Sequence, residues 1–485
     1  MKHISVILFV LAFIASAHGQ DELSKTSAYL EKIRKNESQL QAFFHQMPKG
    51  GDLHHHFSGA VYAETFFDTA VGKHYLLDTS ALVVYPPGTP TGGVRSIVAF
   101  DSMSNGKRSY FKDRLIRLWS VKDFSPCDGA SDAHFFATFG LFGPTIAGSE
   151  AAMLQEIKQR AIAEHTDYIE TMFMRPSLNY KDQSVLAYLT KYNPLLAQAE
   201  AKHDTTKVWS LFNEMYRVLH DSLGVLKLAE AHHARLVAIR NAAALPNGKD
   251  SLIAIRFLNY VTRASTPADV FAQLYISFAS CDMDSLVMGV NIVAPENSDV
   301  SMNDYWLHMR MFRIFGSRFT NVHISTHAGE LVLGMVKPED LTFHITDAVR
   351  IAHAERIGHG VDIAYEHNVY GILEEMRTRK TAVEINLTSN EFILGVKGAE
   401  HPINLYHSFG VPIVISTDDP GVLRSDHSGE FVKLASRYPN FTYLDIKQFV
   451  YNSIEYSFMK ESDKSKLKNR LDREFELFEE QISSL

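Results

Sequence analysis

The chain has 485 residues, of which 46% are hydrophobic and 21% charged, and its formal net charge is −8. These proportions are ordinary for a soluble globular protein, and the length allows one large barrel or two to three smaller domains. The acidic balance argues against non-specific binding to nucleic acid, whose phosphates require a basic face, so no nucleic-acid partner is expected.

Residues 1–19 have the pattern of a secretory signal peptide. Lys2 precedes an apolar run from Ile4 to Ala15, and Ala15-Ser16-Ala17 offers a small-residue cleavage site. The run is too short to span a bilayer, although an uncleaved membrane anchor is the alternative. No later segment is long and apolar enough for a spanning helix, so we expect a secreted or periplasmic protein without a membrane partner.

A helical leader over residues 20–46 is predicted to precede the main domain, residues 47–485. Apolar side chains recur at helical spacing between residues 24 and 46, and Met47-Pro48-Lys49-Gly50-Gly51 ends the pattern. An insertion is predicted over about residues 70–135, whose part from 75 to 110 is rich in Pro, Gly and Ser and lacks a clear period. The two cysteines, Cys127 and Cys281, could form a disulfide or remain buried thiols.

Eight short apolar runs alternate with helical patterns, which is typical of βαβ units and a parallel sheet. A count of eight favours a closed (β/α)8 TIM barrel of the α/β class over an open sheet. The predicted strands are Asp52–Phe57, Tyr168–Met174, Leu252–Phe257, Leu286–Ile292, Val322–Thr326, Arg356–Gly358, Ala382–Asn386 and Val411–Ser416. Helical patterns cover residues 151–165, 205–238 and 305–315, and a charged helix is expected after Asp463.

Histidines and acids gather at the ends of these predicted strands, where a barrel places its catalytic groups. His54 and His56 alternate on the first strand and so share a face, whereas His55 points the other way. His327 and Glu330 follow the fifth strand, His359 the sixth, and Asp418 and Asp419 the eighth. Each has a structural alternative, such as a buried histidine or a helix-capping acid. Together, three imidazoles and a carboxylate match the ligands of a hydrolytic zinc, although other divalent ions accept them.

The ordered motifs resemble the adenosine deaminases from about Met47 to the C-terminus. They are Met47-Pro48-Lys49-Gly50 leading into His54-His55-His56, then His327-Ala328-Gly329-Glu330, Arg356-Ile357-Gly358-His359-Gly360 and Ser416-Thr417-Asp418-Asp419-Pro420. The signal peptide, the leader and the insertion are similar to the secreted branch, the adenosine deaminase-related growth factors.

The resemblance implies a role for each site residue. One Zn²⁺ per chain would be held by His54, His56, His327 and Asp418. His359 would orient and help to deprotonate the attacking water, and Glu330 would protonate the purine ring nitrogen beside the carbon under attack. Asp419 would hold the far ring nitrogen and help to position the water, and Gly289 would offer a backbone N–H to the purine. Family members often carry a ribose-contacting acid just after the first-strand histidines; the stretch here is Phe57-Ser58-Gly59, which makes Ser58 the sugar-side candidate.

The implied activity is zinc-dependent hydrolytic deamination of adenosine or 2′-deoxyadenosine to inosine or deoxyinosine plus ammonia. A purine nucleoside is the expected small-molecule partner, and a homodimer is compatible with a sequence that does not fix the oligomeric state. Two alternatives stay open: a non-catalytic secreted binding or signalling protein on the same barrel, and a deaminase of another 6-aminopurine such as adenine.

Overall fold

The computed structural model describes residues 20–178, 188–222 and 224–485. The predicted signal peptide, residues 1–19, lies outside these ranges. Within them, no helix combines the length and the apolar character that crossing a membrane requires.

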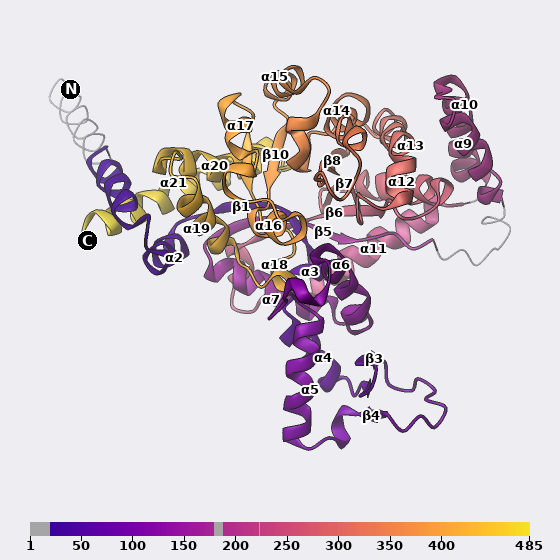
Figure 1. Cartoon of the computed structure of the whole chain (residues 1–485), viewed down its shortest axis with the longest axis horizontal. Helices are drawn as coiled ribbons and strands as arrows, with labels where there is room; N and C mark the ends of the chain where they lie inside the picture. Colours follow the sequence, from indigo (N-terminus) through magenta and orange to yellow (C-terminus); the bar gives the residue numbers. More distant parts are fainter. Residues whose placement is uncertain (1–19, 179–187, 223) are drawn as a thin grey trace, which may run out of the picture.

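Eight parallel strands form the centre of the molecule (Figure 1). Their order in the sheet follows their order in the chain, and each predicted strand overlaps an observed one. They are β1 (Gly50–His56), β5 (Thr166–Met174), β6 (Ala254–Thr262), β7 (Val287–Val293), β8 (His323–Ala328), β9 (Arg356–His359), β10 (Ala382–Ile385) and β11 (Ile413–Ile415). The first and last strands meet at Asp418, whose backbone N–H donates to the His54 carbonyl (2.8 Å) and whose carbonyl accepts from the His56 N–H (2.9 Å). The fold is therefore the predicted (β/α)8 TIM barrel.

Helices surround the barrel because each buries an apolar face against the strands. After β6, Thr266 caps α12 (Pro267–Cys281), whose side chains are almost all buried, and Ser298 caps the next helix, α13 (Asp299–Gly316). Later helices are α15 (Val369–Arg379), α16 (Leu387–Leu394), α17 (Ile403–Ser408), α18 (Pro420–Leu423), α19 (His427–Arg437), α20 (Tyr443–Glu455) and α21 (Glu461–Ser483). Short helical turns and the helix α14 (His344–Asp347) lie between β8 and β9.

The leader consists of two helical segments, where the sequence predicted one. Residues 20–33 are helical, and a second helix, α2 (Glu37–Gln46), begins after Asn36, whose side chain accepts from the N–H of Gln39. Aromatic side chains of α2 pack against the C-terminal helices: the ring of Phe43 lies 5.0 Å from that of Phe478 on α21. The leader and α21 consequently lie together at one end of the molecule (Figure 1).

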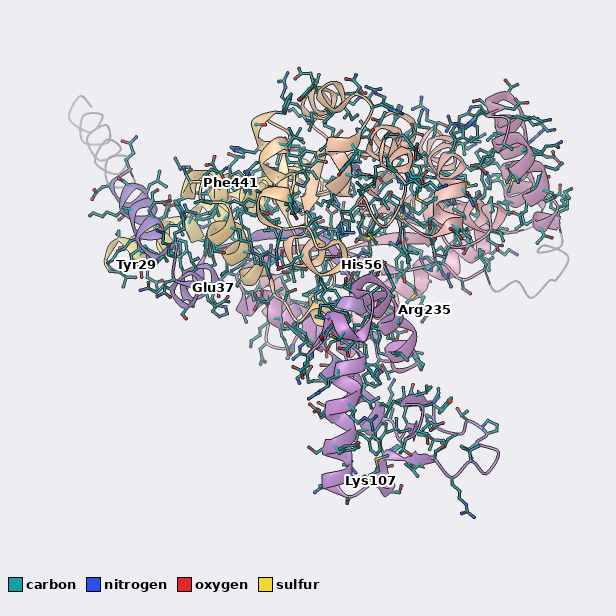
Figure 2. The ribbon with its side chains drawn as sticks, in the orientation of Figure 1. Tyr29, Glu37, His56, Lys107, Arg235 and Phe441 are labelled. Atoms are coloured by element: carbon teal, nitrogen blue, oxygen red, sulfur yellow. The ribbon has the colours of Figure 1, made fainter. Side chains whose placement is uncertain are left out.

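The insertion between β1 and β5 is more regular than the sequence indicated. Three short antiparallel strands, β2 (Leu76–Asp78), β3 (Val83–Tyr85) and β4 (Ile97–Ala99), form a separate sheet within the stretch predicted to be irregular. Helices complete the insertion: α3 (Phe57–Ala60), α4 (Ala63–Gly72), α5 (Asn105–Leu118), α6 (Ser131–Phe142) and α7 (Glu150–Ala163). Lys107 on α5 lies at the far end of this extension, and His56 lies at the barrel (Figure 2). The insertion therefore extends outward, but α6 returns to the barrel.

A second excursion lies between β5 and β6. It contains α9 (Asn193–Glu200), α10 (Thr205–Arg217) and α11 (Leu226–Ala242). The single helix predicted over 205–238 is interrupted by a π-helical turn at Val218–Ser222. The cysteines are far from equivalent, because Cys127 is exposed and Cys281 is buried, and both are free thiols. Neither alternative holds for the pair: the disulfide is not formed, and only Cys281 is a buried thiol.

Candidate active site

The predicted site residues meet at the carboxyl ends of the barrel strands. His54 and His56 come from β1, His327 from β8 and His359 from β9, and Asp418 follows β11. His55 points away from them and contacts the Thr171 hydroxyl through Nδ1 (2.9 Å), as the strand alternation predicted. The predicted convergence at one mouth of the barrel is therefore present.

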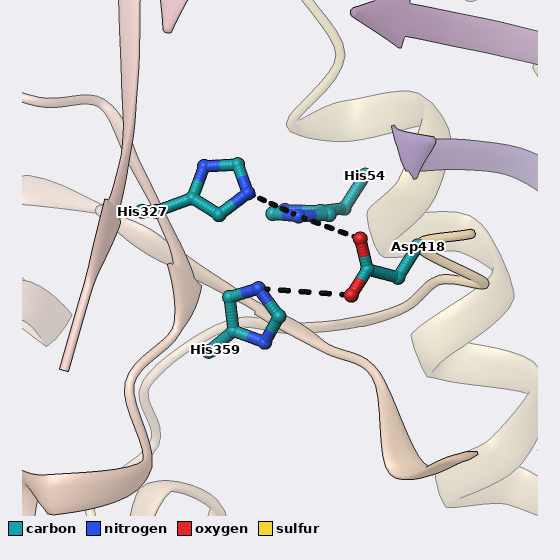
Figure 3. Close-up of side chains that lie close together, drawn as sticks. All are labelled: His54, His327, His359 and Asp418. Carbon is teal, nitrogen blue, oxygen red and sulfur yellow. Dashed lines mark hydrogen bonds and ion pairs between the residues drawn. The ribbon is translucent and has the colours of Figure 1, made fainter. Parts of the chain in front are cut away.

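The ligand atoms of the four predicted metal ligands lie close together in four of their six pairs. Nε2 of His327 lies 3.1 Å from Nε2 of His54 and 3.1 Å from Nε2 of His56. Oδ1 of Asp418 lies 3.6 Å from Nε2 of His54 and 3.3 Å from Nε2 of His56. The group whose ligand atoms all lie within 4.8 Å of one another is His54, His327, His359 and Asp418 (Figure 3), so it contains His359 in place of the predicted His56. His56 belongs to a second such group, with Asp418 and Asp419.

A hydrogen bond on the outer side of the His327 ring leaves its unprotonated nitrogen facing the other candidate ligands. Nδ1 of His327 donates to Oδ1 of Asn291 (2.9 Å), an oxygen that also accepts from two backbone N–H groups. A single lone pair is then left on Nε2 of His327, although two other imidazole nitrogens lie 3.1 Å from it. Ligands at about 2.0–2.2 Å from a tetrahedral zinc lie about 3.3–3.6 Å apart. A cation thus fits the spacing and the donor set better than hydrogen bonds between the rings.

A buried ionic network contacts His54 on the Nδ1 side of its ring, away from the other candidate ligands. Its Nδ1 donates to Oε2 of Glu384 (2.6 Å), whose other oxygen accepts from Nε of Arg356 (2.5 Å). The Arg356 guanidinium also donates to Glu170 (2.6 Å), and all three charged side chains are at most 1% exposed. Carboxylates in this position orient an imidazole ligand and raise its basicity. Sequence analysis missed Glu384 and Asn291, whose only local signal is a polar residue inside an apolar strand.

Burial keeps most of these imidazoles uncharged. It lowers the pKa of His56 to about 4, against the attraction of Asp418, and it lowers the pKa of His327 to well below its ordinary range. For His54 burial is opposed and outweighed by Glu384, so its pKa is raised. Burial would raise the pKa of Asp418, but the facing histidines His359, His54 and His56 lower it below the ordinary value. A divalent metal requires a carboxylate and neutral imidazoles, so its binding would displace the proton that Glu384 favours on His54.

Glu330 lies beside this cluster in a different state. Its Oε1 is 3.7 Å from Nε2 of His359, and the residue is 7% exposed. Burial, followed by the charges of Asp418 and Glu296, raises its pKa well above the usual range, which favours the protonated carboxyl. Glu296 fixes the loop by accepting from the N–H groups of Gly329 (3.2 Å) and Glu330 (2.9 Å).

Asp419 is the second proton-bearing carboxyl. Burial, followed by the neighbouring charge of Asp418, raises its pKa well above the ordinary value. Its side chain lies against Gly59, where a Cβ atom would come 1.5 Å from Oδ1 of Asp419. A glycine is required at this position because any side chain would displace Asp419.

The residues above open into a cavity of about 380 Å³. One wall is aromatic and comes from α6, which supplies Phe135, Phe136 and Phe139. The remaining lining residues are His56, Ser58, Arg175, Tyr260, Thr262, Val293, Ala294, Pro295, His327, Glu330, His359, Asp418 and Asp419. Sequence analysis missed the wall and Arg175, because the wall comes from the insertion.

Gly289 does not reach this cavity. It lies near the start of β7, where a Cβ atom would come 2.7 Å from the carbonyl oxygen of His323, so a glycine is needed there for close strand packing. Val293, Ala294 and Pro295 line the cavity on this connection, and Ala294, just after the strand, has a positive φ of 89°. Positive φ also occurs at His359 (70°) and Asp418 (63°), and such backbone strain in non-glycine residues clusters at functional sites. The expectation for Gly289 is corrected accordingly, whereas Ser58 does line the cavity.

Comparisons with known proteins identify the family of this chain. The family model described as adenosine deaminase matches residues 232–474, half of the chain. The adenosine deaminase of Clostridium perfringens is 32% identical over 153 residues, which are 31% of this chain and 42% of that relative. The chain thus aligns with less than half of that curated relative's length.

Two solved structures share the fold at low identity. An amidohydrolase from Burkholderia ambifaria with bound zinc aligns over 92% of this chain and 95% of its own, with a TM-score of 0.53 and 18% identity. The N6-methyl-AMP deaminase from Arabidopsis thaliana aligns over 89% and 98%, with a TM-score of 0.56 and 15% identity. On the match of the family model, this chain belongs to the adenosine deaminase family.

Proposed function

We propose that this protein is a zinc-dependent hydrolase that removes the 6-amino group of a purine nucleoside. Adenosine or 2′-deoxyadenosine would give inosine or deoxyinosine and ammonia. One observation carries the proposal: Glu330, a buried carboxyl whose pKa is raised by burial, shares a cavity with a cluster of imidazoles and a carboxylate suited to a metal ion. Family membership supports the same chemistry.

Each site residue has a separate role in the proposed reaction. His54, His56, His327 and Asp418 would hold the ion, which supplies Lewis-acid activation of water at neutral pH when bound. Glu330 donates its proton to the ring nitrogen beside the carbon under attack, so that negative charge does not accumulate on the purine. Asp419, which also keeps its proton, donates to the far ring nitrogen and orients the base. The phenylalanine wall offers an apolar face to the ring.

The test is a deamination panel run on protein of measured zinc content. Loss of the adenosine absorbance with release of ammonia supports the proposal, and no change with any 6-aminopurine contradicts it. The panel includes free adenine, AMP and N6-methyl-AMP, because a structural neighbour is an N6-methyl-AMP deaminase and Ser58 stands where an acid often lies. Strict preference for adenine or for a nucleotide would transfer the proposal to that substrate.

A non-catalytic binding protein would not need a proton carrier next to the metal ligands. Replacement of Glu330 by alanine separates the two cases, since the barrel and the four ligands remain. Turnover at the parent rate in E330A would favour the binding role, and loss of turnover supports catalysis.

We further propose that the protein acts outside the cytoplasm and is related to the secreted growth-factor branch of the family. The pattern of residues 1–19, the helical leader and the insertion after β1 support this assignment. Fractionation of the native host followed by N-terminal sequencing tests it. A mature protein in the cytoplasm that retains Met1 would contradict it.

A further inference from the structure

A chain of buried polar groups holds the ring of His359 from the side opposite the cavity. The N–H of Ile403 lies 3.2 Å from Nδ1 of His401, and Nε2 of His401 lies 3.0 Å from Oδ1 of Asn390. Nδ2 of Asn390 then lies 3.0 Å from Nδ1 of His359. The three side chains are at most 2% exposed, and the family resemblance gives a role only to the last of them, His359.

The direction of every hydrogen bond in this chain follows from its first member. A backbone N–H can only donate, so Nδ1 of His401 is the bare, accepting nitrogen. The proton of the His401 ring therefore lies on Nε2 and is donated to the Asn390 oxygen. Turning the Asn390 amide over would place its NH₂ group against this N–H, which excludes the alternative orientation.

We propose that Asn390 and His401 are positioning residues that hold His359 in the tautomer with its proton on Nε2. Nδ1 of His359 accepts from the Asn390 amide, and the amide of Asn386 is a second donor at 3.5 Å. A ring nitrogen that accepts a hydrogen bond carries no proton, so the proton of the ring lies on the nitrogen that faces the cavity.

This tautomer determines what His359 offers to the site. Nε2 lies 3.7 Å from Glu330 and 3.9 Å from Asp418, beyond hydrogen-bond distance, and it has no partner within the described part of the chain. The N–H is therefore directed at the space between two carboxyl groups. His359 supplies a donor there, whereas a fourth imidazole ligand or a base would need a bare nitrogen. In this respect the inference rests on the proposed function: the donor would stabilise the oxygen that attacks the purine.

The tautomer can be measured without turnover. Full-length protein labelled with ¹⁵N-histidine, zinc-loaded and metal-free, should show the His359 proton on Nε2, with the signals assigned by their loss in H359Q. N390D presents an acceptor to Nδ1 and should move the proton there. H401Q keeps a donor toward Asn390 and should preserve the parent pattern, whereas H401L should lose it. A bare Nε2 in the parent, or the parent pattern in N390D, would overturn the assignment.

Kinetics separate this role from a purely structural one. N390D should lower kcat about 100-fold with little change in KM, and H401Q should stay near the parent. His232→Gln is the matched control, because His232 is a buried imidazole that contacts Asn259 (2.9 Å) away from the cavity. A moved proton with unchanged kcat would refute the donor role. Should N390D fail to fold, the His359 tautomer and the kcat of H401L are compared with those of H401Q. Equal values in the two variants would refute the positioning role. A parent that turns over no substrate would count against the proposed function, and the spectra would still decide the tautomer.

Discussion

Replacing Glu330 by glutamine removes a proton donor and keeps the shape of the side chain. The carboxyl is 7% exposed, and burial raises its pKa well above the usual range, so it holds the proton that the reaction needs. Loss of a positioned general acid slows a reaction by about 100- to 10,000-fold, which corresponds to about 3 to 5 kcal/mol of activation free energy. We expect that loss in kcat for E330Q, followed by adenosine absorbance. A variant that retains more than about a tenth of the parent kcat would refute the reasoning.

Although E330Q should lose activity, the same variant should be more stable than the parent at high pH. The unfolded chain loses the Glu330 proton above its ordinary pKa of 4.5, whereas the folded protein keeps it because its pKa is raised. Between the pKa of Glu330 in the unfolded chain and its pKa in the folded protein, each added pH unit lowers the free energy of unfolding of the metal-free parent by about 1.4 kcal/mol. Glutamine does not titrate, so E330Q does not lose this stability. Metal-free E330Q should therefore unfold at a higher temperature than the parent at about pH 8 and at the same temperature below about pH 4. The exposed substitution Glu339→Gln is the control, and destabilised E330Q at high pH would indicate a distorted site.

Three further changes probe the metal site and the scaffold. H327A should reduce zinc, measured by mass spectrometry, from about one per chain to near zero, because it removes the nitrogen shared by both first-strand histidines; full zinc content would contradict the ligand set. G358A would place a Cβ atom 2.5 Å from the His54 ring and should weaken zinc affinity about 10- to 100-fold, whereas G106A, with open space around it, should not. Burial raises the pKa of Glu430 to about 7, so the parent loses stability as pH rises from about 4.5 to 7; E430Q should remove that slope in thermal unfolding, and an unchanged slope would refute it.

The barrel could be predicted from sequence because buried parallel strands are short apolar runs. The predicted and observed strand ends differ by at most two residues, except that β6 (Ala254–Thr262) extends five residues beyond the predicted Leu252–Phe257. The convergence of the candidate ligands could be predicted for the same reason, since polar residues at the carboxyl ends of such runs face one mouth of the barrel. Their side-chain separations confirm that convergence.

Features set by distant contacts could not be predicted. The leader keeps its helical spacing across residues 34–36, because both segments bury the same face. The break there is accompanied by hydrogen bonds from the Arg34 guanidinium to the carbonyls of Ala435 and Phe441, about 400 residues away. Gly289 was assigned to the substrate from a motif alone, and only its place at the start of β7 shows that strand packing explains the glycine.

The joint between the first and last strands lies at Asp418, whose backbone bonds to His54 and His56 and whose side chain faces the same two rings. An ion that binds these side chains therefore also fastens the two ends of the barrel, so that metal occupancy and ring closure form one linked equilibrium. Chelation should speed amide hydrogen exchange along β1 and β11, while β7, on the far side of the ring, remains protected. The amides at this joint would then report metal loss in the absence of any substrate.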